Sequence, residues 1–230
     1  MTDDFSARVE RIGALAEPVR RALYEYVVAQ RDAVGREQAA AGVDVPVHTA
    51  KFHLDRLVSE GLLTVEFRRL TGRTGRGAGR PAKLYSRAEQ PVSVSLPERR
   101  YDLAGRILAA GVERAAREGV PVDEAVRAAA AGEGVRVGTE AAGDGPELER
   151  TSQALAGQGY EPRSAPDAGL ELELELANCP FDSLAREHTE LVCGFNHAFV
   201  GGVLDGLDCA GLTASLDPAP GLCCVRVHPR

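Results

Sequence analysis

Residues 46–87 read PVHTAKFHLDRLVSEGLLTVEFRRLTGRTGRGAGRPAKLYSR, and they predict a helix followed by a β-hairpin. Apolar residues of the helical part follow the three-and-four spacing of a single buried stripe. They are Val47, Ala50, Leu54, Leu57 and Val58. Gly61 is expected to end the helix, because glycine tolerates the left-handed turn that closes many helices.

The hairpin is predicted from the segment LTVEFRR (63–69), whose apolar and polar residues alternate as in a half-buried strand. Four glycines interrupt the stretch that follows, and LYSR (84–87) begins a returning strand. From Glu66 to Arg87, seven basic residues stand against one acid, a net charge of +6. The basic residues are Arg68, Arg69, Arg73, Arg76, Arg80, Lys83 and Arg87. Arginine on a glycine-rich loop can follow a phosphate backbone, so we predict a recognition helix with a basic wing.

Upstream of this helix, FSARVERIGALAEPVRRALYEYVVAQ (5–30) predicts one helix, or two short helices broken near Pro18. Its expected core stripe consists of Val9, Ile12, Leu15, Val19, Leu23 and Tyr26. GREQAAAGV (35–43) fits a short helix, and VDVP (43–46) fits the turn before the recognition helix. This order of elements predicts a winged helix-turn-helix domain over residues 6–90.

Residues 8–87 resemble ArsR-type winged-helix regulators, most strongly in KFHLDRLVSEGLL (51–63) and GRGAGRPAKLYSR (75–87). The resemblance implies that the exposed side of the recognition helix enters the major groove of DNA and that the hairpin tip lies on the neighbouring backbone or minor groove. The expected DNA-binding residues are His48, Thr49, Lys51, Arg56, Arg73, Arg76, Arg80 and Lys83. Thr49 and Lys51 are placed to reach base edges, whereas Arg56 is expected at a phosphate.

Charge is distributed unevenly along the 230 residues, whose net charge is −7. Residues 1–100 hold 17 Lys and Arg against 13 Asp and Glu, and residues 101–230 hold 10 against 21. This asymmetry predicts a half that binds nucleic acid and a different, acidic half. No apolar run approaches the roughly 20 residues that span a bilayer. The acidic start MTDDFSARVER lacks an apolar signal segment, so we expect a cytoplasmic protein with no membrane partner.

A helix is predicted from about Pro97, with an apolar seam suited either to pairing with a second copy or to packing on its own domain. The seam consists of Tyr101, Ala104, Leu108, Val112 and Ala115. DEAVRAAAA (123–131) predicts a short helix, and the glycine-rich GEGVRVGTEAAGDGP (132–146) is expected to be a boundary. Residues 97–132 are therefore predicted to be a helical linker or dimerisation region.

From Glu147 the pattern predicts a small α+β sensor domain over residues 147–230. It comprises a helix in 147–160, an alternating Leu/Glu strand in 169–178, a helical stretch over 181–207 and two short strands in 212–227. The helical stretch is expected to break near His188. The whole chain is thus predicted to be α+β, with an N-terminal winged helix-turn-helix, a central dimerisation helix and a small C-terminal sensor domain.

All five cysteines lie in the last 52 residues, at Cys179, Cys193, Cys209, Cys223 and Cys224. In a reducing cytosol they are not expected to form structural disulfides. Their clustering favours a metal, an iron–sulfur cluster or redox chemistry, with buried apolar thiols as the alternative. The gaps between them lack the short CxxC pairs of zinc ribbons and ferredoxins, so the spacing alone is a weak signal.

NCPFDSLAREHTELVCGFN (178–196), together with Cys209 and the CCV at 223–225, is similar to the C-terminal domain of SufR-type regulators. These are iron–sulfur-sensing repressors with the same winged-helix front end. The resemblance implies a cluster on Cys179, Cys193, Cys209 and one of Cys223 and Cys224. The doubled cysteine departs from that pattern, as does His188, which lies close to Cys193. A structural zinc site that includes His188 therefore stays open as a rival.

The predicted function is sequence-specific binding of a double-stranded DNA operator by a homodimeric repressor under the control of these cysteines. The alternatives are a regulator with a structural zinc, a regulator with an organic effector, and a thiol redox enzyme that uses Cys223–Cys224. The sequence offers no catalytic triad or paired carboxylates in a supporting context. Gly75–Gly79 mimics a nucleotide-binding loop, but it joins strand to strand, so we do not expect an enzyme.

Overall fold

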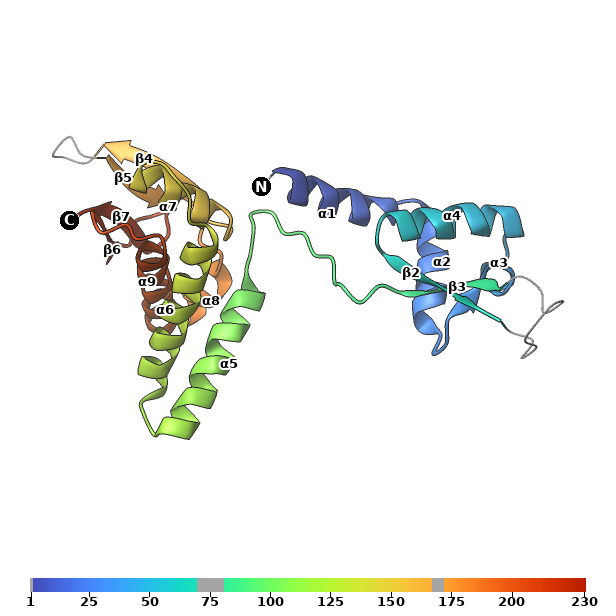
Figure 1. The fold of residues 1–230 in the computed structure, drawn as a ribbon, viewed down its shortest axis with the longest axis horizontal. Coiled ribbons are helices and arrows are strands. Elements are labelled where there is room, and N and C mark those ends of the chain that lie inside the picture. Colours follow the sequence, from blue (N-terminus) through green and yellow to red (C-terminus); the bar gives the residue numbers. More distant parts are fainter. Residues whose placement is uncertain (1, 70–80, 167–171) are drawn as a thin grey trace. The chain divides into compact units, whose positions relative to one another are not determined.

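The computed structural model describes residues 2–69, 81–166 and 172–230, except for the side chains of residues 2–4, 165, 166 and 172. The chain divides into two units, Met1–Val94 and Ser95–Arg230 (Figure 1). The first unit covers the winged-helix region predicted at 6–90. The second combines the predicted linker region 97–132 with the predicted sensor domain 147–230, and these two regions share one hydrophobic core.

The first unit has the predicted order of helix, helix, recognition helix and hairpin. Its elements are α1 (Thr2–Ala14), α2 (Pro18–Ala29), β1 (Val34–Gly35), α3 (Arg36–Val43), α4 (Val47–Ser59), β2 (Leu63–Arg68) and β3 (Ala82–Arg87). The strands form an antiparallel sheet in the order β1-β3-β2. Leu63 pairs with Arg87 and Arg68 pairs with Ala82, so β2 and β3 form the predicted wing hairpin.

Local chemistry explains where these helices begin and end. The break between α1 and α2 falls at Pro18, and the Glu17 carboxylate caps α2 by accepting hydrogen bonds from the N–H groups of Val19 and Arg20. Asp44 adopts a left-handed conformation (φ 56°) after α3, which turns the chain towards α4. Gly61 (φ +67°) follows α4, as predicted.

The core of the first unit includes Leu23, Leu54, Leu57 and Tyr85. The predicted stripe of α4 is correct except at Val47, which is 42% exposed. In α1 the prediction is wrong for two residues.

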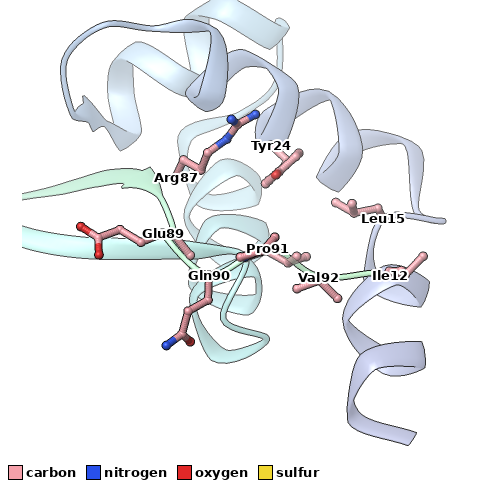
Figure 2. Close-up of a pocket in the computed structure, with 10 residues that line it drawn as sticks. Ile12, Leu15, Tyr24, Arg87, Glu89, Gln90, Pro91 and Val92 are labelled. Carbon is pink, nitrogen blue, oxygen red and sulfur yellow. The ribbon is translucent and has the colours of Figure 1, made fainter. Parts of the chain in front are cut away.

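The two wrongly predicted α1 residues, Val9 and Ile12, are 43% and 42% exposed because this helix packs only its C-terminal end on the core. Ile12 instead lines a groove of about 320 Å³ together with Leu15, Tyr24 and the segment 87–92 (Figure 2).

The second unit packs helices against a four-stranded antiparallel sheet of order β4-β5-β7-β6. Its elements are α5 (Tyr101–Glu118), α6 (Val122–Glu140), α7 (Glu147–Ala156), β4 (Pro162–Pro166), β5 (Leu172–Leu176), α8 (Asp182–Glu187), α9 (Thr189–Gly206), β6 (Leu212–Leu216) and β7 (Val225–Pro229). α6 lies along α9 and α5 lies along α6 (Figure 1). Phe181, Phe195 and Phe199 are fully buried at the centre of this core.

The glycine-rich segment 132–146 was predicted to be a boundary, and this prediction is wrong. α6 continues through Gly132, Gly134 and Gly138 to Glu140. A Cβ added at Gly134 would lie 2.1 Å from the carbonyl oxygen of Phe199, so the missing side chain lets α6 approach the backbone of α9. Glycine serves here as a helix-packing surface, and its local preference for turns is overridden by tertiary contact.

The apolar seam predicted for α5 is also displaced. Its buried residues are Leu103, Ala104, Ile107 and Gly111, whereas Tyr101 and Val112 are 41% and 54% exposed. The helix begins at Tyr101, four residues later than predicted. It therefore packs on α6 through a face rotated from the predicted one, and Val112 remains on the surface.

Other predictions for the second unit are confirmed. Leu174 and Leu176 of β5 are buried, whereas Glu173 and Glu175, which alternate with them, are partly exposed. The helical stretch breaks at His188 between α8 and α9. β4 was not predicted. Cys223 and Cys224 lie just before β7 rather than on it.

No helix in the described parts of the chain combines the length and apolar character needed to cross a membrane.

Candidate functional site

The first candidate site is the exposed face of α4. His48 and Lys51 are exposed near its N-terminus, Thr49 is half-buried, and Arg56 is exposed one turn from its C-terminal end. The opposite face of the same helix is fixed in the core by Ala50, Leu54 and Leu57. The packing thus presents His48, Lys51 and Arg56, together with the 65% exposed Phe52, on the face that a recognition helix uses to read base edges.

Asp55 connects this helix to the wing. Its Oδ1 atom accepts hydrogen bonds from Lys83 Nζ (2.5 Å) and Tyr85 Oη (2.9 Å), and its Oδ2 atom accepts one from Lys51 Nζ (3.1 Å). Lys83 Nζ also lies 5.2 Å from the centroid of the Tyr85 ring. One carboxylate therefore orients Lys51 on α4 and Lys83 on β3, two of the predicted DNA-binding residues.

These contacts determine the protonation states of Asp55 and Tyr85. Burial alone would raise the pKa of Asp55, but the hydrogen bonds from Lys83, Lys51 and Tyr85 outweigh it and lower the pKa below its usual 3.8. Burial and the hydrogen bond to Asp55 raise the pKa of Tyr85. The carboxylate is thus charged at neutral pH and the tyrosine keeps its proton.

Two other residues of α4 are held by neighbours. Arg56 Nη2 lies 2.6 Å from Glu60 Oε1, on the exposed side of the helix. His53 Nδ1 accepts a hydrogen bond from Arg20 Nε at 3.4 Å and lies 3.5 Å from Glu17 Oε2, which ties α4 to the start of α2. Three predicted wing residues lie outside the described residues. They are Arg73, Arg76 and Arg80.

The second candidate site consists of Cys179, Cys193, Cys223 and Cys224, which we call the thiol cluster. Cys179 lies in the loop after β5, Cys193 lies on α9, and Cys223 and Cys224 precede β7. Electrostatic coupling connects the thiols: the pKa of Cys223 depends on Cys179 and Cys224, and the pKa of Cys224 depends on Cys223 and Cys193. Both members of the doubled cysteine therefore belong to the group.

Backbone contacts and aromatic packing hold the loops that carry these thiols. The Cys223 N–H donates to the carbonyl oxygen of Leu176 at 2.7 Å, which ties the segment before β7 to the end of β5. Two residues after Cys179, the fully buried Phe181 ring contacts Phe195 of α9 edge-on, with centroids 5.1 Å apart. Strand end, helix and final loop are thereby fixed around one part of the core.

The thiol cluster favours one negative charge, on Cys223. The pKa of Cys223 is lowered because its sulfur accepts hydrogen bonds from the Cys179 and Cys224 thiols, from the Val225 N–H and from Asn196. The hydrogen bond to Cys223, together with burial, raises the pKa of Cys179 and of Cys224. A single thiolate surrounded by donors is the state that these contacts stabilise.

Asn196 and Tyr160 complete this site, and neither was predicted from the sequence. Asn196 Nδ2 lies 3.2 Å from Cys223 Sγ and 3.7 Å from Cys224 Sγ, and its Oδ1 atom accepts a hydrogen bond from Tyr160 Oη. Asn196 is 1% exposed and Tyr160 is 2% exposed. The available signal was the i, i+3 spacing of Cys193 and Asn196, which puts both residues on one face of α9.

The other possible metal ligands, Cys209 and the histidines His188 and His197, have different neighbours from those of the thiol cluster. Cys209 is buried, and its sulfur accepts hydrogen bonds from Arg150 Nη2 (3.6 Å) and Thr151 Oγ1 (3.7 Å). His188 is exposed at the junction of α8 and α9. His197 Nε2 lies 3.0 Å from the carbonyl oxygen of Ala214 on β6. As they stand, the described residues contain no group of three or more Cys, His, Asp or Glu side chains arranged around a metal position.

Comparisons with known proteins identify the first unit. Residues 15–66 match a family of helix-turn-helix domains, and this stretch begins just after α1 and ends within β2. The chain therefore carries an N-terminal helix-turn-helix domain of the kind found in DNA-binding regulators. The sequence has no match among curated proteins.

One solved structure resembles the chain weakly, that of human N-acetylserotonin methyltransferase in complex with SAM. The match has 16% sequence identity and a TM-score of 0.26, and it covers 88% of this chain and 45% of the enzyme. The chain thus spans less than half the length of that enzyme. A score this low transfers neither fold nor activity.

Proposed function

We propose that this protein is a dimeric, sequence-specific transcription regulator that represses its targets, and that an iron–sulfur cluster held by the second unit controls its binding to DNA. The observation that carries the proposal is the exposed face of α4, with Lys51 and Arg56, within a helix-turn-helix domain and joined to the wing through Asp55. Such a helix is shaped for the major groove, and Lys83 of the wing beside it meets the phosphates.

DNA recognition in this proposal divides between base and backbone contacts. Thr49 and Lys51 lie towards the N-terminus of α4 and are assigned to base edges, with Lys51 suited to guanine. Lys51 Nζ is 3.1 Å from Asp55, so reaching a base means exchanging one hydrogen-bond partner for another. Arg56, His48 and Lys83 are assigned to backbone contacts.

For control, the thiol cluster offers the ligand type of an iron–sulfur centre, since four cysteine thiolates are the usual ligands of such clusters. Binding would draw the four sulfurs around one position, which they do not surround as they stand. Cys179, Cys193, Cys223 and Cys224 would hold the group. A bound cluster would supply one-electron redox chemistry and sensitivity to oxidants or to iron shortage. The chain's own contribution is a buried environment in which Asn196 and the Val225 N–H already donate to the sulfur of Cys223.

A structural zinc is the second candidate, because four thiolates also form a common zinc site. The observation in its favour is the partial burial of the whole thiol cluster beside the fully buried Phe181 and Phe195, typical of a closed structural site. Cys209 and His188 are not assigned as ligands in either case, given the partners and exposure described above.

The dimer is proposed to form through the surface of α5, where Val112 is 54% exposed. A homodimer of winged helices reads a pseudo-palindrome whose half-sites lie about one helical turn, roughly 34–36 Å, apart.

The test starts with protein purified without oxygen. Iron, acid-labile sulfide and zinc are measured on the same sample, and footprinting follows on a duplex selected by the protein from a random pool. We expect iron and sulfide in equal amounts and two protected half-sites. Zinc alone would favour the structural-metal alternative. A single asymmetric half-site would refute the dimer, and failure to bind any duplex in dilute buffer would refute the function.

A further inference from the structure

The segment that leads into α5 is bonded to the loop that carries Cys179. The Arg100 N–H donates to the carbonyl oxygen of Pro180 at 3.0 Å. Arg99 Nη1 donates to Asn178 Oδ1 and lies 3.3 Å from the carbonyl oxygen of Cys179. In return, Asn178 Nδ2 donates to the carbonyl oxygen of Glu98 at 2.9 Å. The two segments thus exchange hydrogen bonds in both directions, across about 80 residues of sequence.

These contacts are well shielded from water. Asn178 is 5% exposed, and the Arg99 side chain is 19% exposed. Asn178 Nδ2 also donates to the carbonyl oxygen of Gly159 (2.6 Å), and Arg99 Nη2 lies 3.7 Å from Asp182 Oδ2. A buried polar group that loses its partner is costly, so the loop and the segment are expected to move together.

The same segment is the covalent connection to the DNA-binding unit. The two units divide between Val94 and Ser95, only a few residues before Arg99. Ser95 belongs to the bonded group, because its Oγ atom accepts a hydrogen bond from the Arg99 N–H at 2.8 Å. At its other end, Tyr101 begins α5 and its hydroxyl oxygen lies 2.7 Å from Ser183 Oγ. A displacement of the Cys179 loop therefore reaches the point where the chain leaves the second unit.

We propose that Arg99 is a positioning residue: it bonds the backbone of the Cys179 loop to the segment that leads into α5, and it transmits displacement of that backbone to the junction at Val94–Ser95. The proposal rests on the proposed function, since it names the connection through which the thiol cluster would change DNA binding. Arg99 acts on the carbonyl group of Cys179 and on Asn178, and it need not touch a bound metal. Replacing Arg99 should therefore leave metal binding by the thiol cluster intact and remove the effect of that binding on DNA affinity.

The test compares Arg99→Ala with the matched control Arg106→Ala. Arg106 lies on α5 and forms an exposed i, i+4 pair with Asp102 (3.1 Å), so its replacement removes the same charge without touching the Cys179 loop. Each full-length protein is prepared reduced and metal-free, and again after anaerobic reconstitution with iron and sulfide. The quantity measured is the ratio of the two dissociation constants for a duplex selected by the wild-type protein.

For wild type and Arg106→Ala we expect a ratio in the range of roughly 5- to 150-fold that is typical of coupled sites. For Arg99→Ala we expect a ratio close to 1, with iron content and metal-free DNA affinity unchanged. Arg99→Lys, which keeps the charge and a single donor, should give an intermediate ratio and serves if the alanine variant does not fold. A second readout needs no metal: in the reduced apoprotein, Arg99→Ala should speed hydrogen exchange at the Arg100 amide.

The outcomes distinguish the role of Arg99 from the control of DNA binding by the thiol cluster. A wild-type ratio retained in both Arg99 variants would overturn the role of Arg99 alone. Loss of iron from Arg99→Ala would also overturn it, because the residue would then hold the site and not transmit its state. A ratio of 1 in the wild type, with iron and sulfide bound, would instead refute control of DNA binding by the thiol cluster.

Discussion

The two units surround their functional side chains in opposite ways. In the DNA-binding unit, Lys51 is 55% exposed and its partner Asp55 is 34% exposed, so the ion pair is open to water and to a polyanion. In the second unit, Cys223 and Asn196 are each 1% exposed, and their polar atoms are hydrogen-bonded to one another. A surface that reads DNA must exchange partners on binding, whereas a thiol centre depends on partners that stay in place.

This difference predicts how substitutions act. Changes on the first unit's basic surface should alter DNA affinity and its salt dependence with little loss of stability, because exposed ion pairs contribute little to folding. Changes in the second unit should alter stability first, because its functional groups share the core with α6 and α9.

The largest effect is expected at the contact between α6 and α9. Gly134→Ala would place a Cβ 2.1 Å from the carbonyl oxygen of Phe199, so the two helices must separate. We expect a loss of about 3 kcal/mol in the free energy of unfolding, the upper range for overpacking a core. The measurement is chemical denaturation of the apoprotein, followed by far-UV circular dichroism.

Gly132→Ala is the matched control on the same helix. A Cβ at Gly132 meets nothing within 4 Å, so this change should be neutral or should stabilise by up to about 1 kcal/mol, through helix propensity alone. Equal stabilities for the two variants would contradict the close packing of α6 on α9. Loss of duplex binding by Gly134→Ala at low temperature would contradict the contrast between the units, because a change in the core of the second unit would then alter DNA binding and not only stability.

The next effect concerns the wing. Replacing Arg73, Arg76 and Arg80 with alanine should weaken binding to every duplex sequence and reduce the slope of log affinity against log salt by about 3. These arginines lie outside the described residues, so the prediction rests on their charge and their position between β2 and β3. Fluorescence anisotropy at several salt concentrations gives the slope.

A triple substitution in the second unit provides the control for lost charge. Arg114, Arg117 and Arg127 are exposed residues of α5 and α6 in surface ion pairs, and their replacement with alanine should leave the salt slope unchanged. If both triple variants keep the wild-type slope, the wing has no part in DNA binding. If both flatten it, net charge and not the wing sets the affinity.

The sequence predicted the first unit better than the second, for physical reasons. The recognition helix and hairpin follow from local periodicity, and Gly61 marks the helix end through its own backbone preference. α6 could not be predicted in this way, because Gly134 and Gly138 are favoured by a helix that lies more than 60 residues further along the chain. Local sequence rules describe the backbone preference of a glycine, but they do not reveal the distant helix that packs against it.

The thiol cluster shows the same limit. The cysteines were predicted as candidate ligands, but their spacing along the sequence does not determine which of them come together in the fold. The fold brings Cys223 and Cys224 to Cys179 and Cys193, and it gives Cys209 different partners, Arg150 and Thr151. Asn196 was missed because a buried asparagine has no periodic signature; only its place three residues after Cys193 marks it.

A smaller effect is expected from the polar pair beside the thiol cluster. Asn196→Leu removes the donor to Cys223 and leaves the Tyr160 hydroxyl group buried without its acceptor. We expect a loss of roughly 1–3 kcal/mol in stability, the cost of one unpaired buried group. The pKa of Cys223 should rise, which a pH titration of ultraviolet thiolate absorbance in the reduced apoprotein measures.

Combining Asn196→Leu with Tyr160→Phe sharpens this prediction. The double variant removes both members of the pair, so part of the lost stability should return while the pKa of Cys223 stays raised. A double variant no more stable than Asn196→Leu would mean that the Tyr160 hydroxyl finds another partner. An unchanged titration in both proteins would mean that Asn196 does not favour the thiolate.

The smallest effect is expected at the junction between α4 and the wing, where Asp55→Asn keeps the shape of the side chain and removes its charge. The lowered pKa of Asp55 means that its carboxylate stabilises the fold above pH 3.8 and that this contribution is lost as the pH falls below that value. The variant should therefore be less stable by about 0.5–1 kcal/mol at neutral pH, and the difference from wild type should shrink towards acid. Asp32→Asn, at an exposed position of the same unit, controls for the change in net charge.

The same substitution should act on DNA in the opposite direction. Removing the carboxylate releases Lys51 and Lys83 and takes away one negative charge that faces the phosphates, so affinity for a non-specific duplex should rise a few-fold at low salt. Binding to the selected duplex should gain less, because an oriented Lys51 is part of base reading in the proposed complex. Equal gains on both duplexes would mean that Asp55 only lowers the local charge. A larger gain on the non-specific duplex would mean that the open, exchangeable ion pairs of the first unit also contribute to its sequence preference.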